Sequence, residues 1–130
     1  MARSEKHWQQ IFNQYLREKR LHGYYELKQT SADSFPFSKI ETNQYEGLQA
    51  TKKEGLVWKL SDEDRRLKPC DTLCIPPLPS YIVIKFEDAF YFIDIDDIVA
   101  MRERGEAGIT KARANVIAKR ILRLTATPPV

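Results

Sequence analysis

The tripeptide Glu26-Leu27-Lys28 places a carboxylate and an ammonium group two residues apart within the run YYELKQT. On a β-strand, Glu26 and Lys28 would project from one face and Leu27 from the other, because side chains alternate along a strand. This pair has two interpretations. One is an exposed ion pair worth about 0.5 kcal/mol. The other is a metal-binding carboxylate beside a cation that positions a water molecule or stabilises charge on a phosphate.

Three other polar residues are expected to point towards the interior. Glu5 lies three residues before Trp8 and shares the apolar stripe of a predicted N-terminal helix, and Gln44 lies on the apolar side of a second predicted helix. Asp71 begins a predicted strand in the run KPCDTLCI. Inward-facing acids are costly unless they are paired or bind a metal ion, so these residues are candidates for a functional site.

Carboxylates that converge on a lysine are what metal-dependent hydrolysis of a phosphodiester requires. Mg²⁺ prefers hard oxygen ligands and keeps several water molecules, so two carboxylates and a backbone carbonyl suffice to hold it. The sequence therefore predicts a magnesium site formed by Glu26, Asp71 and the carbonyl of Leu27. Asp33, in the loop after the strand, is the alternative to Asp71.

The spacing of apolar residues predicts the elements that position these side chains. We expect helices over 4–20, 41–54, 96–104 and 111–124, and strands over 24–30, 56–60, 71–75, 81–86 and 89–93. Gly55 is expected to end the second helix, and Asp96 and Thr110 to cap the later two. Strand 56–60 is expected to be buried, with Trp58 in the core. This order predicts an α/β domain with a mixed sheet.

Length and composition describe one compact globular domain, since the chain has 130 residues, 42% of them hydrophobic and 30% charged. The longest apolar run, 81–86, is interrupted by Lys85 and is far too short to cross a membrane. The N-terminal run MARSEKHWQQ carries charge where a signal peptide needs an apolar core, so we expect a cytoplasmic protein. Cys70 and Cys74 are then expected to be reduced, buried thiols rather than zinc ligands.

Positive charge is concentrated near the C-terminus, although the net charge is only +3. Residues 87–97 include five acids and no base, whereas residues 102–123 include seven bases and two acids. The basic segment is either a phosphate-binding surface or a solvated helix face. The candidate DNA contacts are Lys111, Arg113, Lys119, Arg120 and Arg123.

This layout resembles the PD-(D/E)xK nuclease superfamily, and within it the Holliday junction resolvases of archaea, bacteria and their phages. The resemblance rests on the helical Glu5 and on the strand that carries Glu26 and Lys28. It also rests on the stretch FPFSKIETNQYEGL with Gln44 and on KPCD, which ends in Asp71. One feature departs from the family, in which the metal-binding Asp precedes the ExK strand: here Asp71 follows Glu26 by about 45 residues.

The resemblance implies a restriction endonuclease-like fold, with a mixed β-sheet flanked by helices. It implies a single nuclease domain over 1–130, with a core at about 3–95 and a basic C-terminal helical extension at about 96–124. The implied activity is that of a Mg²⁺-dependent DNA endonuclease, with Mn²⁺ as a substitute, which resolves four-way junctions by paired phosphodiester hydrolysis. A junction has near two-fold symmetry, so the enzyme is expected to act as a homodimer.

The resemblance also implies a role for each site residue. Glu26 and Asp71 would hold the metal ion, Lys28 would orient the attacking water or stabilise developing charge, and Gln44 would support Lys28 or that water. Glu5 would be an outer carboxylate or a ligand of a second metal ion. Two alternatives remain open: a restriction- or repair-type nuclease of the same fold, and a non-catalytic nucleic-acid-binding module.

Overall fold

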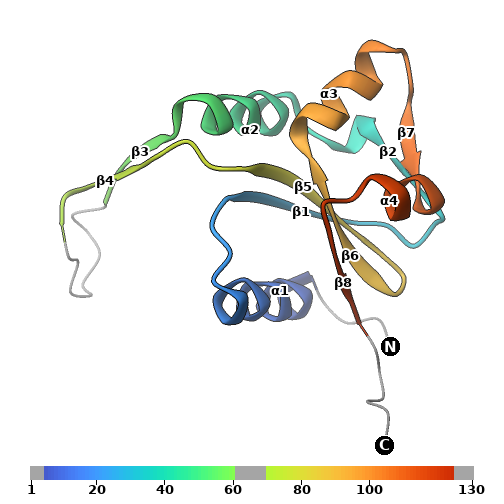
Figure 1. Ribbon diagram of the computed structural model, residues 1–130, viewed down its shortest axis with the longest axis horizontal. Coiled ribbons are helices and arrows are strands. Elements are labelled where there is room, and N and C mark those ends of the chain that lie inside the picture. Colours follow the sequence, from blue (N-terminus) through green and yellow to red (C-terminus); the bar gives the residue numbers. More distant parts are fainter. Residues whose placement is uncertain (1–4, 61–69, 125–130) are drawn as a thin grey trace, which may run out of the picture.

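The chain combines helices and strands, with four consecutive strands near its middle (Figure 1). The computed structural model describes residues 5–60 and 70–124, with the side chain of Glu5 outside this described part. The elements are α1 (Glu5–Lys19), β1 (Tyr24–Gln29), β2 (Ser34–Pro36), the short 3-10 helix η1 (Phe37–Lys39), α2 (Thr42–Glu54), β3 (Leu56–Lys59), β4 (Thr72–Ile75), β5 (Ser80–Phe86), β6 (Ala89–Asp94), α3 (Ile95–Glu103), β7 (Gly108–Thr110), α4 (Lys111–Ile117) and β8 (Arg120–Arg123).

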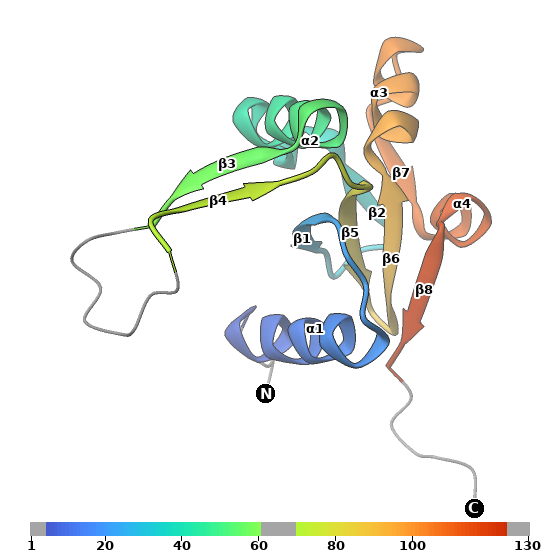
Figure 2. The same ribbon diagram turned by 60° about the vertical axis from the view of Figure 1, so that its left-hand side comes forward.

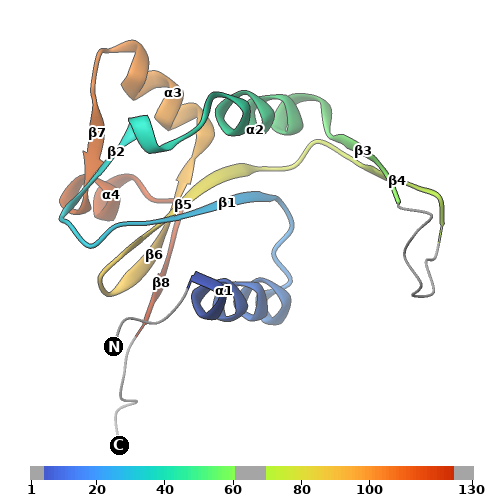
Figure 3. The same cartoon turned by 180° about the vertical axis from the view of Figure 1, so that it is seen from behind.

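The main sheet has the strand order β1-β5-β6-β8. β1 runs parallel to β5, with Glu26 beside Ile82 and Lys28 beside Ile84, and the other neighbours are antiparallel. Parallel neighbours need a crossover connection, and here α2 and the β3–β4 hairpin lie between the two strands in the chain. β1 is therefore an edge strand, which Figure 3 shows between α1 and α2.

Helices cover both faces of this mixed sheet, as the sequence predicts (Figure 2). Because side chains alternate along β5 and β6, each strand supplies both faces with apolar groups. The α1 face is built by Phe12, Val83, Phe90 and Phe92. The face beneath α2 and α3 includes Leu48, Ile82, Ile84, Tyr91, Ile93 and Ile98. No helix in residues 5–60 or 70–124 is long and apolar enough to cross a membrane.

The β3–β4 hairpin extends away from the main sheet and differs from its predicted place in the core (Figure 1). Val57 is 69% exposed and Trp58 59% exposed, so the prediction of a buried strand over 56–60 was wrong. Cys70 and Cys74 are free thiols, but both are exposed, which contradicts their predicted burial. The reason is that, within residues 5–60 and 70–124, β3 pairs with β4 and no other strand. A two-stranded ribbon presents both faces to solvent unless another layer covers it.

The C-terminal segment also differs from the predicted helix over 111–124. Thr110 caps α4 as predicted, since its hydroxyl accepts a hydrogen bond from the Arg113 N–H, but α4 ends at Ile117. Residues 120–123 form β8, which pairs antiparallel with β6. Ile121 and Leu122 pack on opposite faces of the sheet, a two-residue alternation that suits a strand.

The helix that follows β6 is confirmed, but its cap differs from the expected Asp96. Asp94 caps α3, and its carboxylate accepts a hydrogen bond of 2.8 Å from the Asp96 N–H. Asp96 instead lies in the first turn together with Asp97, where carboxylates interact favourably with the positive end of the helix dipole.

Candidate active site

Glu26 and Lys28 lie on one face of β1, which confirms the alternation predicted from the tripeptide. Lys28 Nζ is 3.6 Å from Glu26 Oε1, and the two side chains are 19% and 33% exposed, respectively. Leu27 packs on the opposite face of the sheet, in the cluster beneath α1. The strand therefore presents the carboxylate and the ammonium towards α2 while the residue between them anchors it.

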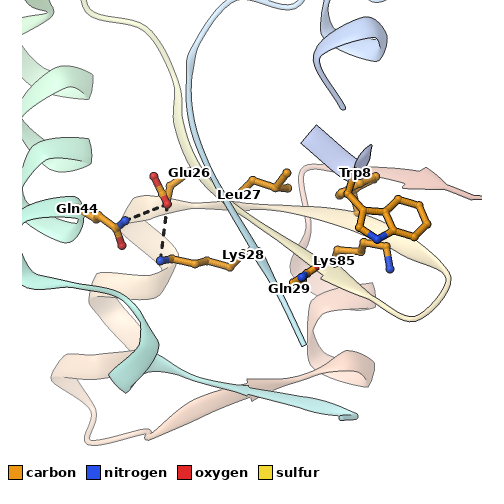
Figure 4. Close-up of a pocket in the computed structure, with 8 residues that line it drawn as sticks. Trp8, Glu26, Leu27, Lys28, Gln29, Gln44 and Lys85 are labelled. Carbon is orange, nitrogen blue, oxygen red and sulfur yellow. Dashed lines mark hydrogen bonds and ion pairs between the residues drawn. The ribbon is translucent and has the colours of Figure 1, made fainter. Parts of the chain in front are cut away.

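Gln44 joins this pair because of its position in the first turn of α2. Its side-chain oxygen accepts a hydrogen bond of 3.2 Å from the Glu41 N–H, while the Glu41 carboxylate accepts one from the Gln44 N–H. Because the capping box holds the amide oxygen of Gln44 at Glu41, the amide nitrogen points towards β1. Gln44 Nε2 donates a hydrogen bond of 2.9 Å to Glu26 Oε1 (Figure 4). The predicted trio of Glu26, Lys28 and Gln44 is thus assembled from β1 and α2.

Both of these contacts fall on the same oxygen of Glu26. In the described part of the chain, no hydrogen-bond donor or cation contacts Glu26 Oε2. The carboxylate is therefore held in place through one oxygen while the other stays available to a ligand.

The backbone of Leu27 faces the open edge of β1. The N–H groups of Tyr24 and Thr30 donate to carbonyls of Pro79 and Lys85, on the β5 side. Along a strand in a parallel pair, successive residues direct their backbone groups to alternate sides. The N–H and C=O of Leu27 therefore point away from β5, which leaves this carbonyl available as an oxygen ligand.

The side chains around this edge enclose a pocket of about 320 Å³. Its lining residues are Trp8, Glu26, Leu27, Lys28, Gln29, Gln44, Lys85 and Phe90. Four of these, Trp8, Gln29, Lys85 and Phe90, were not predicted as site residues. Lys85 Nζ lies 4.0 Å from the centre of the Trp8 ring. The signal that could have revealed Lys85 is its position as the one charged residue in the apolar run 81–86.

Asp71 is not brought to this pocket. It directly precedes β4 at the outer end of the hairpin, where its carbonyl accepts a hydrogen bond from the Leu60 N–H. The other end of β4 lies beside β1, because the Tyr24 hydroxyl donates to the carbonyls of Ile75 and Pro76. Asp71 lies four positions before Ile75 along an extended strand, a separation of about 13 Å at the usual rise. The hairpin thus carries Asp71 away from Glu26.

The alternative acid, Asp33, lies elsewhere too. Its carbonyl accepts a hydrogen bond of 2.7 Å from the Lys111 N–H, so it sits beside the start of α4. It lines a different hollow, together with Asp88 and Arg123. Glu5 begins α1, and the prediction about its side chain falls outside the described part of the chain.

The five basic residues predicted to contact DNA are distributed over α4, β8 and the turn between them, and each contacts another side chain of this chain. The partners are Asp88 for Lys111 (3.1 Å), Glu106 for Arg113 (3.4 Å), Asp97 for Lys119 (3.8 Å), the Tyr15 hydroxyl for Arg120 (3.2 Å) and Asn115 for Arg123 (3.2 Å). The Lys111 ammonium lowers the pKa of Asp88 through a hydrogen bond. Three of the five cations therefore already face a carboxylate.

A metal ion at this pocket would have few protein ligands. Among residues 5–60 and 70–124, no three His, Cys, Asp or Glu side chains are grouped so that they could share a metal ion. Mg²⁺ is often held by only one or two carboxylates and keeps several waters. Glu26 Oε2 and the Leu27 carbonyl therefore fit a largely hydrated magnesium ion, but the predicted two-carboxylate site is not formed by the described residues.

Comparisons with known proteins found no similar protein. No protein-family model, no curated protein and no solved structure matches the chain. Any functional conclusion therefore depends on the geometry of the pocket at the edge of β1 that contains Glu26.

Proposed function

We propose that this protein is a metal-dependent DNA endonuclease whose active site is the pocket at the edge of β1, where Gln44 of α2 meets Glu26. The observation that carries the proposal is the hydrogen bond from Gln44 Nε2 to Glu26 Oε1, beside Lys28. Three residues of the types and spacing that suit phosphodiester hydrolysis come from two elements and meet at one carboxylate oxygen.

Each residue has a defined task in this proposal. Glu26 Oε2 and the Leu27 carbonyl would hold Mg²⁺ or Mn²⁺, which would polarise the scissile phosphate and acidify a water molecule. Lys28 presents a positive charge where negative charge develops on the phosphate oxygens. Gln44 orients Glu26 through the amide hydrogen bond, so that the free oxygen faces the pocket. Glu5 remains the proposed source of a further carboxylate, with Asp71 no longer needed beside Glu26.

The proposed substrate is a four-way DNA junction and the proposed fold family is restriction endonuclease-like. The parallel β1–β5 pair, with α2 between the two strands in the chain, is consistent with the resemblance to the PD-(D/E)xK resolvases. Paired incision of a nearly two-fold symmetric junction needs two sites, so the acting species would be a homodimer.

The test is a cleavage assay with a labelled four-way junction and a linear duplex of the same sequence. We expect junction cleavage with Mg²⁺ or Mn²⁺, none with a chelator, and little cutting of the duplex. Equal cutting of both substrates would indicate a restriction- or repair-type nuclease of the same fold. Absence of metal-dependent cutting of either substrate by the wild-type protein would contradict the proposal.

One observation favours the non-catalytic alternative, a nucleic-acid-binding module. Among the described residues, Glu26 is the one acid that lines the pocket, and its carboxylate already contacts Lys28 and Gln44. In that case neither the wild type nor Glu26→Gln would cut DNA, and the two proteins would bind DNA equally well. The same variant in a nuclease would bind DNA and fail to cut it.

A further inference from the structure

We propose that the hollow next to the candidate active site, formed by α1 and the ends of β1 and β5, binds the phosphate backbone of a DNA strand. This inference rests on the proposed function, because it assigns the path by which a substrate strand reaches Glu26. The cations that would contact the phosphates are Lys85 on β5 and Lys39 on η1.

The hollow is continuous with the candidate site. Its volume is about 640 Å³. It is lined by Trp8 of α1, by residues 29–31, by Lys39 and Lys85, and by Glu87. Trp8, Gln29 and Lys85 also line the pocket that contains Glu26 and Lys28. Figure 4 shows Lys28 on one side of β1 and Lys85 with Trp8 on the other, so cations flank the strand on both sides. A DNA strand bound at Lys85 would therefore reach the carboxylate by passing around the open edge of β1.

The cations of this hollow lack the neutralising partners that other bases have. In the described part of the chain, no carboxylate oxygen lies within 4.0 Å of Lys85 Nζ or Lys39 Nζ. Burial lowers the pKa of Lys85, and the nearby charge of Glu87 opposes this only in part. A phosphate oxygen would supply the counter-charge that the protein does not, through a charge-assisted hydrogen bond.

Trp8 gives the hollow an aromatic surface beside the cation. The helix that carries it is fixed to the sheet by Phe12, which is 1% exposed. The Trp8 ring meets Phe90 edge-on at 6.4 Å, and the Lys85 ammonium lies over it. Grooves for single-stranded nucleic acid combine positive charge along the backbone with aromatic rings next to the bases. A phosphate that draws the ammonium off the ring would leave the indole facing a nucleoside.

The experiment uses Trp8 as its own reporter. The chain has two tryptophans, and Trp58 is 59% exposed on the hairpin, so Trp58→Phe leaves Trp8 as the single tryptophan without disturbing the core. Excitation at the red edge of the absorption band then selects Trp8 over the tyrosines. In a Trp58→Phe, Glu26→Gln background, titration with a single-stranded oligonucleotide should change the Trp8 emission. The affinity should fall steeply as salt rises, because phosphate contacts release counterions.

Lys85→Met removes the charge and keeps the apolar stem that packs on Trp8. We expect it to weaken binding and to reduce the slope of log affinity against log salt by about 0.7, the value for one phosphate contact with a single strand. Lys53→Met is the matched control, since Lys53 is exposed on α2 and lines none of these hollows. It should leave the slope unchanged.

The outcomes separate this inference from the proposed function. An unchanged slope in Lys85→Met, or equal slopes for Lys85→Met and Lys53→Met, would overturn the inference even if the wild-type protein cuts DNA. A reduced slope in Lys85→Met, together with a wild-type protein that cuts nothing, would support the binding path and reject the nuclease. Emission changes with inorganic phosphate alone, and none with the oligonucleotide, would also overturn it, because the hollow would then accept only a small anion.

Discussion

Two of the regions that carry basic side chains differ in what neutralises the positive charge. Beside β1 and β5, Lys85 and Lys39 face a hollow without a carboxylate in ion-pair contact among the described residues. In the C-terminal segment, Lys111 and Lys119 contact Asp88 and Asp97. The acidic stretch 87–97 and the basic stretch 102–123 stand apart in the sequence, but β6, α3, α4 and β8 bring them together. A dense run of bases is therefore a poor guide to free positive charge.

The acids Glu26 and Asp71 also differ in their surroundings, although the sequence predicts both as metal ligands. Glu26 is held by Gln44 and Lys28 at the edge of the main sheet, whereas Asp71 lies at the outer end of the β3–β4 hairpin. Both are plausible metal ligands in the sequence. Only the first is placed beside a pocket that contains a cation and an amide.

The largest expected effect tests whether the β1 region is the active site. Glu26→Gln should lower junction cleavage by more than about 100-fold, because it removes the charge that would hold the metal ion. DNA binding, measured by gel shift, should remain. Asp71→Asn and Asp33→Asn are the comparison variants and should each retain cleavage within about three-fold of the wild type. If Asp71→Asn is as damaging as Glu26→Gln, the hairpin supplies a ligand and the contrast between the two acids is wrong.

A smaller effect is expected from the residue that orients Glu26. Gln44→Glu keeps an acceptor for the Glu41 N–H, and therefore the capping box of α2, but replaces the donated hydrogen bond with repulsion. We expect cleavage to fall by about 10-fold or more, as for other groups that position a ligand. The thermal midpoint serves as the control. Loss of cleavage with an unchanged midpoint would support positioning, whereas a parallel loss of stability would show that Gln44 acts only on the fold.

The C-terminal bases should contribute less to DNA binding than their number indicates. Replacing Lys119 and Arg120 with Ala would flatten the salt slope by about 0.9 for each lost contact with duplex DNA. Because Lys119 faces Asp97 and Arg120 contacts Tyr15, we expect a total change below one unit, measured on junctions of different sequence. A change in the salt slope near two units would mean that the C-terminal segment is a main DNA contact. The two basic regions would then not differ in their availability to phosphate.

The smallest effect concerns the free energy of unfolding as a function of pH. Burial holds the pKa of Lys85 below its usual 10.5 in the folded protein. Between its folded-state pKa and 10.5, Lys85 therefore binds more protons in the unfolded chain, so its contribution to stability should rise as pH increases through this range. Tyr25, Tyr45 and Lys52 have raised pKa values in the folded protein and act in the opposite direction. Urea unfolding at several alkaline pH values should therefore show the contribution of Lys85 as a difference between the wild type and Lys85→Met. Lys53→Met should keep the wild-type dependence, and an identical dependence in all three would mean that Lys85 is fully solvated.

Much of the fold follows from local signals in the sequence. α2 runs from Thr42 to Glu54, close to its predicted bounds, because Glu41 and Gln44 form a capping box and Gly55 takes a φ of 80° that side chains disfavour. β1 lies within the predicted strand 24–30, and the alternation of side chains along it places Glu26 beside Lys28. These features involve residues within a few positions of one another, so the chain specifies them without reference to distant segments.

What only the tertiary structure decided concerns partners that are remote in sequence. Residues 120–123 leave the predicted helix because they can pair with β6 and put Ile121 and Leu122 on opposite faces of the sheet. Trp58 is exposed because β3 pairs with β4 and with no other strand in the described part of the chain. Burial and free charge depend on which segments lie next to one another after folding. Local spacing determines helices, strands and shared faces, whereas strand order and the pairing of distant charges determine which side chains reach a pocket.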